Sequence, residues 1–242
     1  LMLFPIDHGN SAMKTVNFVF PSGLIDNPIR PPVDTEMLEY DGKFWTLSGQ
    51  RISYMRDKTK DERYWILTLF AIAKELEHRG AEHTASVHLA AGLPLTSFGR
   101  DKKSFRSYLY RDGSTIPFRY EGQDYTITIQ EVSLFPQGYA AVLTQTELLD
   151  EPSVIVADIG GWTVALMRLD NRLPNAATCR SLEWGMIRCI DEISEQVRRV
   201  LGLSLTTAQI ECVLRGDASS LPDEAKGIIH AQADLYVQNL LS

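Results

Sequence analysis

Two short segments of the chain carry residue types that bind phosphate groups and magnesium. Each follows an apolar run of β-strand character and joins an acid to glycine: Asp7-His8-Gly9-Asn10-Ser11 and Asp158-Ile159-Gly160-Gly161-Trp162-Thr163. Such a turn presents successive backbone N–H groups with little side chain in the way, which suits phosphate oxygens. The acid at the strand end suits a hydrated Mg²⁺ ion. If the two turns face each other across a cleft, they can hold a triphosphate from both sides.

Either turn alone is weak evidence, because Asp and Gly are the usual residues of any tight β-turn. Lys14 lies in the strand after the first turn, where its ammonium group can reach a phosphate, although a lone Lys is more often a solvated surface charge. We expect His8 to be an exposed turn residue. The hypothesis of a nucleotide site therefore depends on the repetition of the pattern.

The elements that must position these turns alternate between strands and helices. Strand-like runs at Met2–Asp7 and Met13–Phe20 flank the first turn. A helix is predicted over Thr59–His78, because Thr59 and Glu62 match a capping box and Gly80 follows as a stop. Further predictions are an irregular connection over 26–41, small strands over 43–48 and 86–90, a short basic helix over 102–110, and a hairpin of 116–120 with 125–135.

The remainder of the chain continues the same alternation. A helix over Tyr139–Leu149 leads to a strand over Ser153–Ala157, and Trp162–Leu169 is expected to pair with that strand. Helices are predicted over 181–201, 207–215 and 222–241. The alternation is typical of an α/β protein. A domain boundary is expected at Glu151-Pro152, which divides the chain into residues 1–150 and 151–242.

Composition excludes several classes of function. The formal net charge is -7 with dispersed Lys and Arg, so no basic stripe is available to neutralise a nucleic-acid backbone. The three cysteines show no CxxC spacing, which fits a reducing cytoplasm better than a disulfide or zinc framework. No apolar run approaches the roughly 18 residues of a membrane span. A cytoplasmic location is therefore predicted.

The motifs resemble those of one superfamily. Residues Asp7 to Lys14 match the phosphate-1 pattern D-x-G-x-x-x-x-K of ParM-like members of the actin, Hsp70 and sugar-kinase superfamily. The second turn resembles its phosphate-2 motif, D-[LI]-G-G-x-T. Three other stretches resemble ParM-like proteins in order and spacing: Gly92-Leu93-Pro94-Leu95, Phe135-Pro136-Gln137-Gly138-Tyr139-Ala140 and Ser181-Leu182-Glu183-Trp184-Gly185. The chain thus resembles the actin-like ATPases of the bacterial ParM/StbA plasmid-segregation family.

This resemblance implies an actin-like α/β fold of two ribonuclease-H-like halves. Residues 1–150 would hold the phosphate-1 turn and a small inserted subdomain, and residues 151–242 the phosphate-2 turn. The superfamily's adenosine motif, a strand that ends in a glycine triplet, should follow the last helix. The second half is therefore expected to be incomplete at its C-terminus.

The resemblance also implies roles for individual residues around ATP or GTP and Mg²⁺. Asp7 and Asp158 would hold the metal through water, and Gln137 and Asp158 would be catalytic. An amide is no base at neutral pH, so Gln137 would orient the attacking water, unless it is only a turn residue after Pro136. Asp158 could receive the proton indirectly. The residues expected to contact phosphate are Gly9, Asn10, Ser11, Lys14, Gly160, Gly161, Trp162 and Thr163.

By the same resemblance, the protein would form ATP-driven filaments that carry plasmid DNA through a DNA-bound adaptor protein, with no direct contact to nucleic acid or membrane. One alternative is a small-molecule kinase of the sugar-kinase type. Such a kinase needs a carboxylate base, and the amide of Gln137 argues against it. Another alternative is a non-hydrolysing scaffold, since Trp162 and Ala165 stand where ParM-like motifs often have a hydroxyl and an acid.

Overall fold

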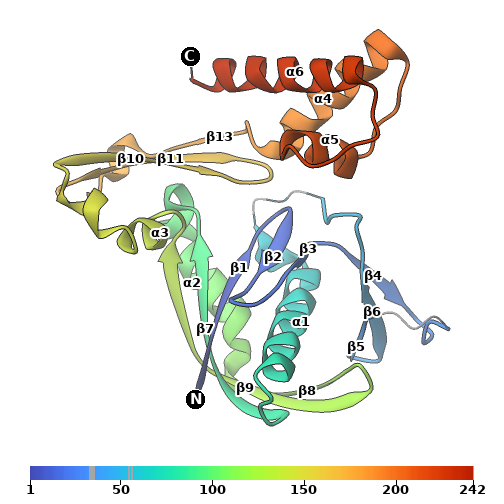
Figure 1. Cartoon of the computed structure of the whole chain (residues 1–242). Helices are drawn as coiled ribbons and strands as arrows, with labels where there is room; N and C mark the ends of the chain where they lie inside the picture. The colour runs from blue at the N-terminus through green and yellow to red at the C-terminus, as the bar shows by residue number, and fades with distance from the viewer. Residues whose placement is uncertain (33–35, 54, 56, 242) are drawn as a thin grey trace. The chain divides into compact units, whose positions relative to one another are not determined.

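The computed structural model describes the whole chain except residues 33–35, 54, 56 and 242 (Figure 1). Its internal contacts divide it into two units. The first unit consists of residues 1–158 and 165–180, and the second of residues 159–164 and 181–242. The domain boundary at residue 150 stays a prediction.

The first unit is built on a mixed sheet that has nine strands within the described residues. Strands β1, β7 and β9 run parallel to one another, and hairpins extend the sheet on both sides. In spatial order the strands are β3 (Val19–Pro21), β2 (Ala12–Lys14), β1 (Met2–His8), β7 (Thr84–Leu93), β9 (Gln123–Pro136), β8 (Thr115–Tyr120), β5 (Met37–Tyr40), β6 (Lys43–Leu47) and β4 (Leu24–Asn27). Strand β5 and the second half of β4 fall within residues 26–41, so the prediction of an irregular connection is wrong there.

Alternating apolar residues place one face of this sheet in the core. A β-bulge interrupts the pairing of β7 with β9, since Val87 pairs with Ile129 but His88 pairs with Glu131. The extra residue in β9 shifts the alternation by one position and so keeps Val132 buried. The bulge therefore sets the register of the end of β9, which leads to Gln137.

The predicted strand over Met13–Phe20 is wrong in its middle, because a turn separates β2 from β3. The Thr15 N–H donates to the Phe18 carbonyl at 2.8 Å. The buried carboxylate of Glu75 holds this turn against the helix in which Glu75 lies, residues 62–78. Glu75 accepts hydrogen bonds from the Thr15 hydroxyl at 2.6 Å, from the Asn17 N–H at 2.9 Å and from the Arg79 guanidinium at 2.8 Å.

The long helix α1 covers Glu62–His78, and its N-cap is Asp61, not Thr59. The Asp61 carboxylate accepts from the Arg63 N–H at 3.0 Å. Thr59 instead belongs to a 3₁₀ turn, η1 (Lys58–Lys60), in which its hydroxyl donates to Asp57 at 2.6 Å. The predicted capping box is therefore wrong, because the Thr59 hydroxyl is already engaged outside the helix.

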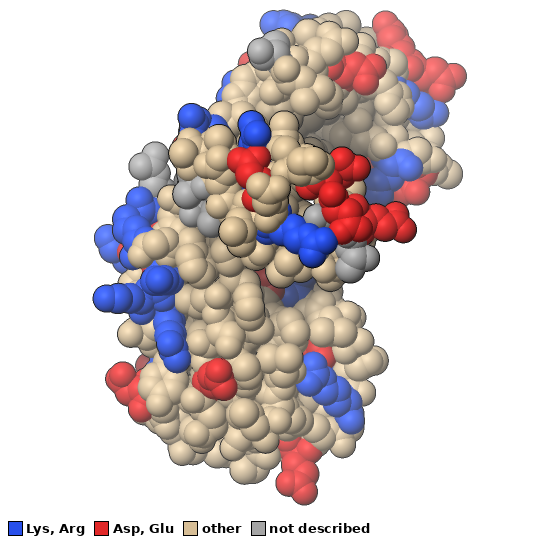
Figure 2. All heavy atoms as spheres, turned by 90° about the vertical axis from the view of Figure 1, so that its left-hand side faces the viewer, with Lys and Arg blue, Asp and Glu red and all other residues tan. Residues whose placement is uncertain are grey.

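Helix α2 extends over Leu95–Tyr110, so the predicted helix over 102–110 was too short. Pro94 precedes it with a φ of -55°, and Gly99 inside it weakened the sequence signal. Its exposed residues include Arg100, Lys102 and Arg106. Figure 2 shows several basic side chains close together at the left edge of the view, with others dispersed over the same face. A short 3₁₀ turn, η2 (Arg111–Gly113), follows the helix.

The rest of the first unit contains a smaller sheet and, before it in the sequence, a short helix and a 3₁₀ turn. Where one helix was predicted, α3 (Tyr139–Leu143) is followed by the 3₁₀ turn η3 (Thr146–Asp150). Strand β11 (Val164–Asp170) lies between β10 (Ser153–Ile159) and β12 (Leu173–Pro174), and β13 (Arg180–Leu182) also pairs with β11. The 3₁₀ turn η4 (Ala176–Thr178) precedes β13. Val142, Met167, Leu169 and Cys179 form a small apolar cluster here.

The second unit packs three helices around an apolar core: α4 (Met186–Leu201), α5 (Thr207–Leu214) and α6 (Asp223–Leu241). Its fully buried side chains include Ile193, Ile210 and Ile229. The prediction that α4 begins at residue 181 is wrong, because residues 180–182 form strand β13. No helix in the described residues is long and apolar enough to cross a membrane.

Replacing Glu75 by Gln is expected to lower the free energy of unfolding by about 3 kcal/mol, because it leaves buried donors without their charged acceptor. Burial raises the pKa of Glu75, but hydrogen bonds from Thr15, Asn17 and Arg79 outweigh it, so the net pKa is lowered. The stabilisation is therefore present above pH about 4.3 and is lost as the pH falls through the lowered pKa.

Urea unfolding at several pH values would test this expectation. The difference between the wild type and Glu75→Gln should shrink in acid, whereas the exposed neighbour variant Glu77→Gln should match the wild type throughout. A Glu75→Gln protein as stable as the Glu77→Gln control at neutral pH would show that this carboxylate does not hold the β2–β3 turn.

Candidate phosphate-binding site

The first turn is a tight connection between β1 and β2 that only glycine can make. A Cβ atom at Gly9 would lie 2.4 Å from the carbonyl oxygen of Ala12. The hydroxyl of Ser22, in the bend after β3, donates to the Gly9 carbonyl at 2.7 Å and fixes the turn. Asp7 is paired with Lys14 in the β1–β2 ladder, and the Lys14 ammonium lies 3.5 Å from the Asp7 carboxylate. Both side chains are partly exposed.

His8 is buried, so the expectation of an exposed turn histidine is wrong. The alternation of β1 places it on the same face as Phe4 and Ile6, and only 1% of it is exposed. Its Nε2 lies 2.9 Å from the Thr68 hydroxyl, which itself donates to a backbone carbonyl of α1. Burial, with the nearby charge of Lys58, lowers the pKa of His8 to about 3. The neutral ring therefore holds the start of the first turn against α1.

Gln137 points from the end of β9 toward the first turn. Its amide Nε2 donates to the Asp7 carboxylate at 3.2 Å, and its backbone N–H donates to the Leu93 carbonyl at 2.8 Å. Gly92 provides the space for this side chain, because a Cβ atom there would lie 2.7 Å from Cγ of Gln137. The close approach explains a glycine at the end of β7.

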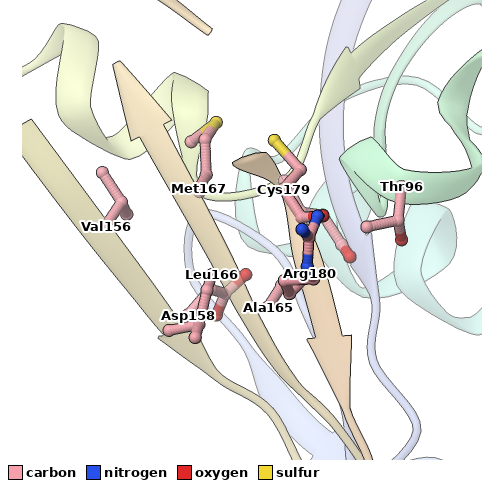
Figure 3. A pocket seen from close by; sticks show the side chains of 10 residues that line it. Thr96, Val156, Asp158, Ala165, Leu166, Met167, Cys179 and Arg180 are labelled. Carbon is pink, nitrogen blue, oxygen red and sulfur yellow. The ribbon is translucent and has the colours of Figure 1, made fainter. Parts of the chain in front are cut away.

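Asp158, at the end of β10 within the first unit, lies near the same carboxylate. Burial raises the pKa of Asp158, the negative charge of Asp7 raises it further, and Lys14 opposes both effects. Asp158 and Gln137 line one small pocket that is partly open to solvent (Figure 3). The other lining residues are Thr96, Gly138, Val156, Ala165, Leu166, Met167, Cys179 and Arg180.

The first unit thus brings Gln137 and Asp158, which are distant in the sequence, to the first turn with its Asp7 and Lys14. The carboxylates of Asp7 and Asp158 carry like charges and repel each other. A divalent cation held between them through water would relieve this repulsion. In the described residues, no group of three or more His, Cys, Asp or Glu side chains could ligate a metal directly. The donor set therefore suits Mg²⁺, which keeps most of its water ligands.

The second turn lies in the other unit, where the start of α4 holds its carbonyl groups. The N–H groups of Gly185, Met186 and Ile187 donate to the carbonyls of Trp162, Gly160 and Gly161, at 3.0, 3.0 and 2.8 Å. In a trans peptide the N–H points away from its C=O. The N–H groups of Gly161, Trp162 and Thr163 therefore point away from α4, as an anion-binding turn requires.

Sequence reasoning missed one cationic residue at this site, Lys58 of η1. Its ammonium group donates to the carbonyl oxygen of His8. Burial lowers the pKa of Lys58 to about 8, although the Asp7 carboxylate opposes this shift. Lys58 belongs to a polar stretch about 50 residues from the turn, and no local pattern in the sequence links the two.

Comparison with known proteins identifies the family. A family model described as the N-terminal domain of actin-like proteins matches residues 6–139, which is more than half of the chain. The chain belongs to the actin-like protein family. The matched segment of this actin-like protein contains Asp7, Lys14 and Gln137. Among curated proteins, no sequence matches the chain.

Solved structures agree with the family assignment. Ta0583, an archaeal actin homologue in complex with ADP, is similar with a TM-score of 0.76 and 18% identity, over 99% of this chain and 81% of its own. ParM from Bacillus thuringiensis with ATP gives 0.70 and 14%, over 99% and 82%. The filament of AlfA from a Bacillus subtilis plasmid gives 0.62 and 17%, over 84% and 80%. The predicted actin-like α/β fold is confirmed.

Proposed function

We propose that this actin-like protein binds a nucleoside triphosphate and forms nucleotide-driven filaments for plasmid segregation. The observation that carries this function is the convergence of Asp7, Gln137 and Asp158 beside a glycine turn, in a chain of actin-like fold. Similar structures add support, since one holds ADP, one holds ATP and one is a filament.

Each residue has a role in this proposal. Backbone N–H groups of Gly9, Asn10 and Ser11, with the Lys14 ammonium, contact phosphate oxygens of ATP or GTP. The N–H groups of the second turn, Gly160 to Thr163, are proposed to bind phosphate as well. Backbone donors suffice for these contacts, so Trp162 and Ala165 do not prevent binding.

Asp7 and Asp158 would hold Mg²⁺ through water, and the bound ion would neutralise part of the triphosphate charge. Gln137 orients the water that attacks the terminal phosphate, because its amide is fixed between Asp7 and Gly92. Asp158 receives the proton of that water indirectly, through a second water.

Assembly would proceed by head-to-tail addition of subunits, since heterologous contacts that do not close produce filaments. We propose that the filament acts in the cytoplasm and reaches plasmid DNA through a DNA-bound adaptor protein. The net charge of -7 supports an adaptor over direct DNA binding.

Light scattering by the full-length protein tests this function. Scattering should rise on addition of ATP with Mg²⁺ and fall again as ATP is hydrolysed, whereas ADP should give no lasting rise. A coupled assay with sugars should show no sugar-dependent ADP release. Phosphorylation of a sugar without any scattering change would favour the small-molecule kinase. Filaments that form without hydrolysis would favour the scaffold.

Replacing Gly92 by Ala is expected to slow hydrolysis about 10-fold or more while nucleotide affinity changes little, because the new methyl group displaces Gln137 from Asp7. Single-turnover hydrolysis and calorimetric titration with ATP separate the two effects. Gly99→Ala is the matched control, since nothing lies within 4 Å of a Cβ atom there. Equal hydrolysis rates in both variants would show that the position of Gln137 is unimportant.

A further inference from the structure

The half-buried side chain of Lys58 places its ammonium group beside His8, at the start of the first turn. Its Nζ donates to the carbonyl oxygen of His8 and lies 5.0 Å from the centre of the Tyr64 ring. Because the His8 carbonyl faces Lys58, the N–H of Gly9 points the opposite way, so the two donors reach different oxygens of a bound polyphosphate. Lys58 thus contacts the turn that is proposed to bind phosphate.

The backbone that carries Lys58 is firmly held. The Asp57 carboxylate accepts from the Thr59 N–H at 3.1 Å and from the Thr59 hydroxyl at 2.6 Å, which fixes the 3₁₀ turn η1. The Asp61 N–H donates to the Lys58 carbonyl at 3.2 Å, where η1 meets α1. The ammonium group is therefore preorganised before any ligand arrives, which reduces the entropic cost of binding.

The nearest negative charge that acts on Lys58, that of Asp7, does not form a direct ion pair with it in the described part of the chain. Within the described part of the chain, no carboxylate forms an ion pair with it. An ammonium group has three donors, and the His8 carbonyl occupies one of them. Burial nevertheless lowers the pKa of Lys58, because the Asp7 carboxylate offsets only part of the lost hydration. A bound anion would supply a direct counterion and accept the remaining hydrogen bonds.

We propose that Lys58 binds a phosphate oxygen of the nucleotide at the first turn, as a second cation beside Lys14. This inference rests on the proposed function. Lys14 is more exposed and already pairs with Asp7. Lys58 is the less exposed of the two, so a phosphate contact there competes less with water.

Calorimetric titration of the full-length protein with ATP tests the proposal, using Lys58→Gln, Lys58→Arg and the control Lys60→Gln. Lys60 belongs to the same 3₁₀ turn but is exposed. Loss of one charge-assisted hydrogen bond should weaken binding about 10- to 100-fold in Lys58→Gln. Lys60→Gln should stay within about twofold of the wild type, and Lys58→Arg should recover most of the affinity because it keeps the charge.

Nuclear magnetic resonance of lysine-labelled wild-type protein gives a second reading that does not depend on the folding of a variant. The ε-methylene signal of Lys58, assigned by its absence in Lys58→Arg, should shift on addition of ATP while that of Lys60 stays in place. An unmoved Lys58 signal, or a Lys58→Gln protein that binds ATP as well as Lys60→Gln, overturns this inference alone. A wild-type protein that binds no nucleotide overturns the proposed function as well.

Discussion

Replacing Asp158 by Ala is expected to abolish measurable nucleotide turnover while part of the nucleotide binding survives. The carboxylate is partly buried beside Asp7 and Gln137, where it is proposed to hold the hydrated metal and to accept a proton. Loss of both roles should slow hydrolysis by about 100- to 1000-fold. Binding should persist, because the phosphate contacts come mainly from backbone N–H groups and lysine.

Single-turnover hydrolysis and titration with ATP measure these two effects separately. Asp158→Asn keeps the size of the side chain and removes its charge, so it should be as slow as Asp158→Ala. Asp124, an exposed acid of β9, provides the control. The variant Asp124→Ala should hydrolyse ATP at the wild-type rate. Wild-type hydrolysis by Asp158→Asn would remove this carboxylate from the mechanism and leave Gln137 as the proposed group for positioning water.

The strand ends and their turns could be predicted from the sequence because their signals are local. An apolar run followed by an acid and glycine marks a strand and its turn within ten residues, and both turns lie between strands as expected. The stop signal of Gly80 likewise placed the end of α1 at His78, where the helix ends. Its start was predicted three residues too early, because the competition of Asp57 for the Thr59 hydroxyl depends on the folded geometry.

The contacts within the site could not be predicted in the same way. The fit of Gln137 over Gly92 joins residues 45 positions apart on neighbouring strands, and its register depends on the bulge in β9. Lys58 reaches the His8 carbonyl across 50 positions. The burial of His8 was within reach of sequence reasoning, since alternation from Phe4 and Ile6 places residue 8 in the core.

The second turn offers the other large expected effect, through the backbone contact between Gly185 and residues 161–162. A Cβ atom at Gly185 would lie 2.3 Å from the carbonyl carbon of Trp162 and 2.5 Å from the carbonyl oxygen of Gly161. Gly185 has a φ of -72° and a ψ of 173°, which any residue adopts, so only the close approach requires glycine. Because the obstructing atoms are backbone, the turn or the start of α4 must move.

Gly185→Ala should therefore break the hydrogen bonds that orient the N–H groups of the second turn. We expect at least about a 10-fold loss of ATP affinity and a loss of about 1–3 kcal/mol of unfolding free energy. Calorimetric titration and urea unfolding measure the two losses. Gly227→Ala, in α6 with nothing within 4 Å of a Cβ atom, should be neutral or slightly stabilising. If Gly185→Ala bound ATP and unfolded like Gly227→Ala, the start of α4 would not determine how the second turn presents its N–H groups.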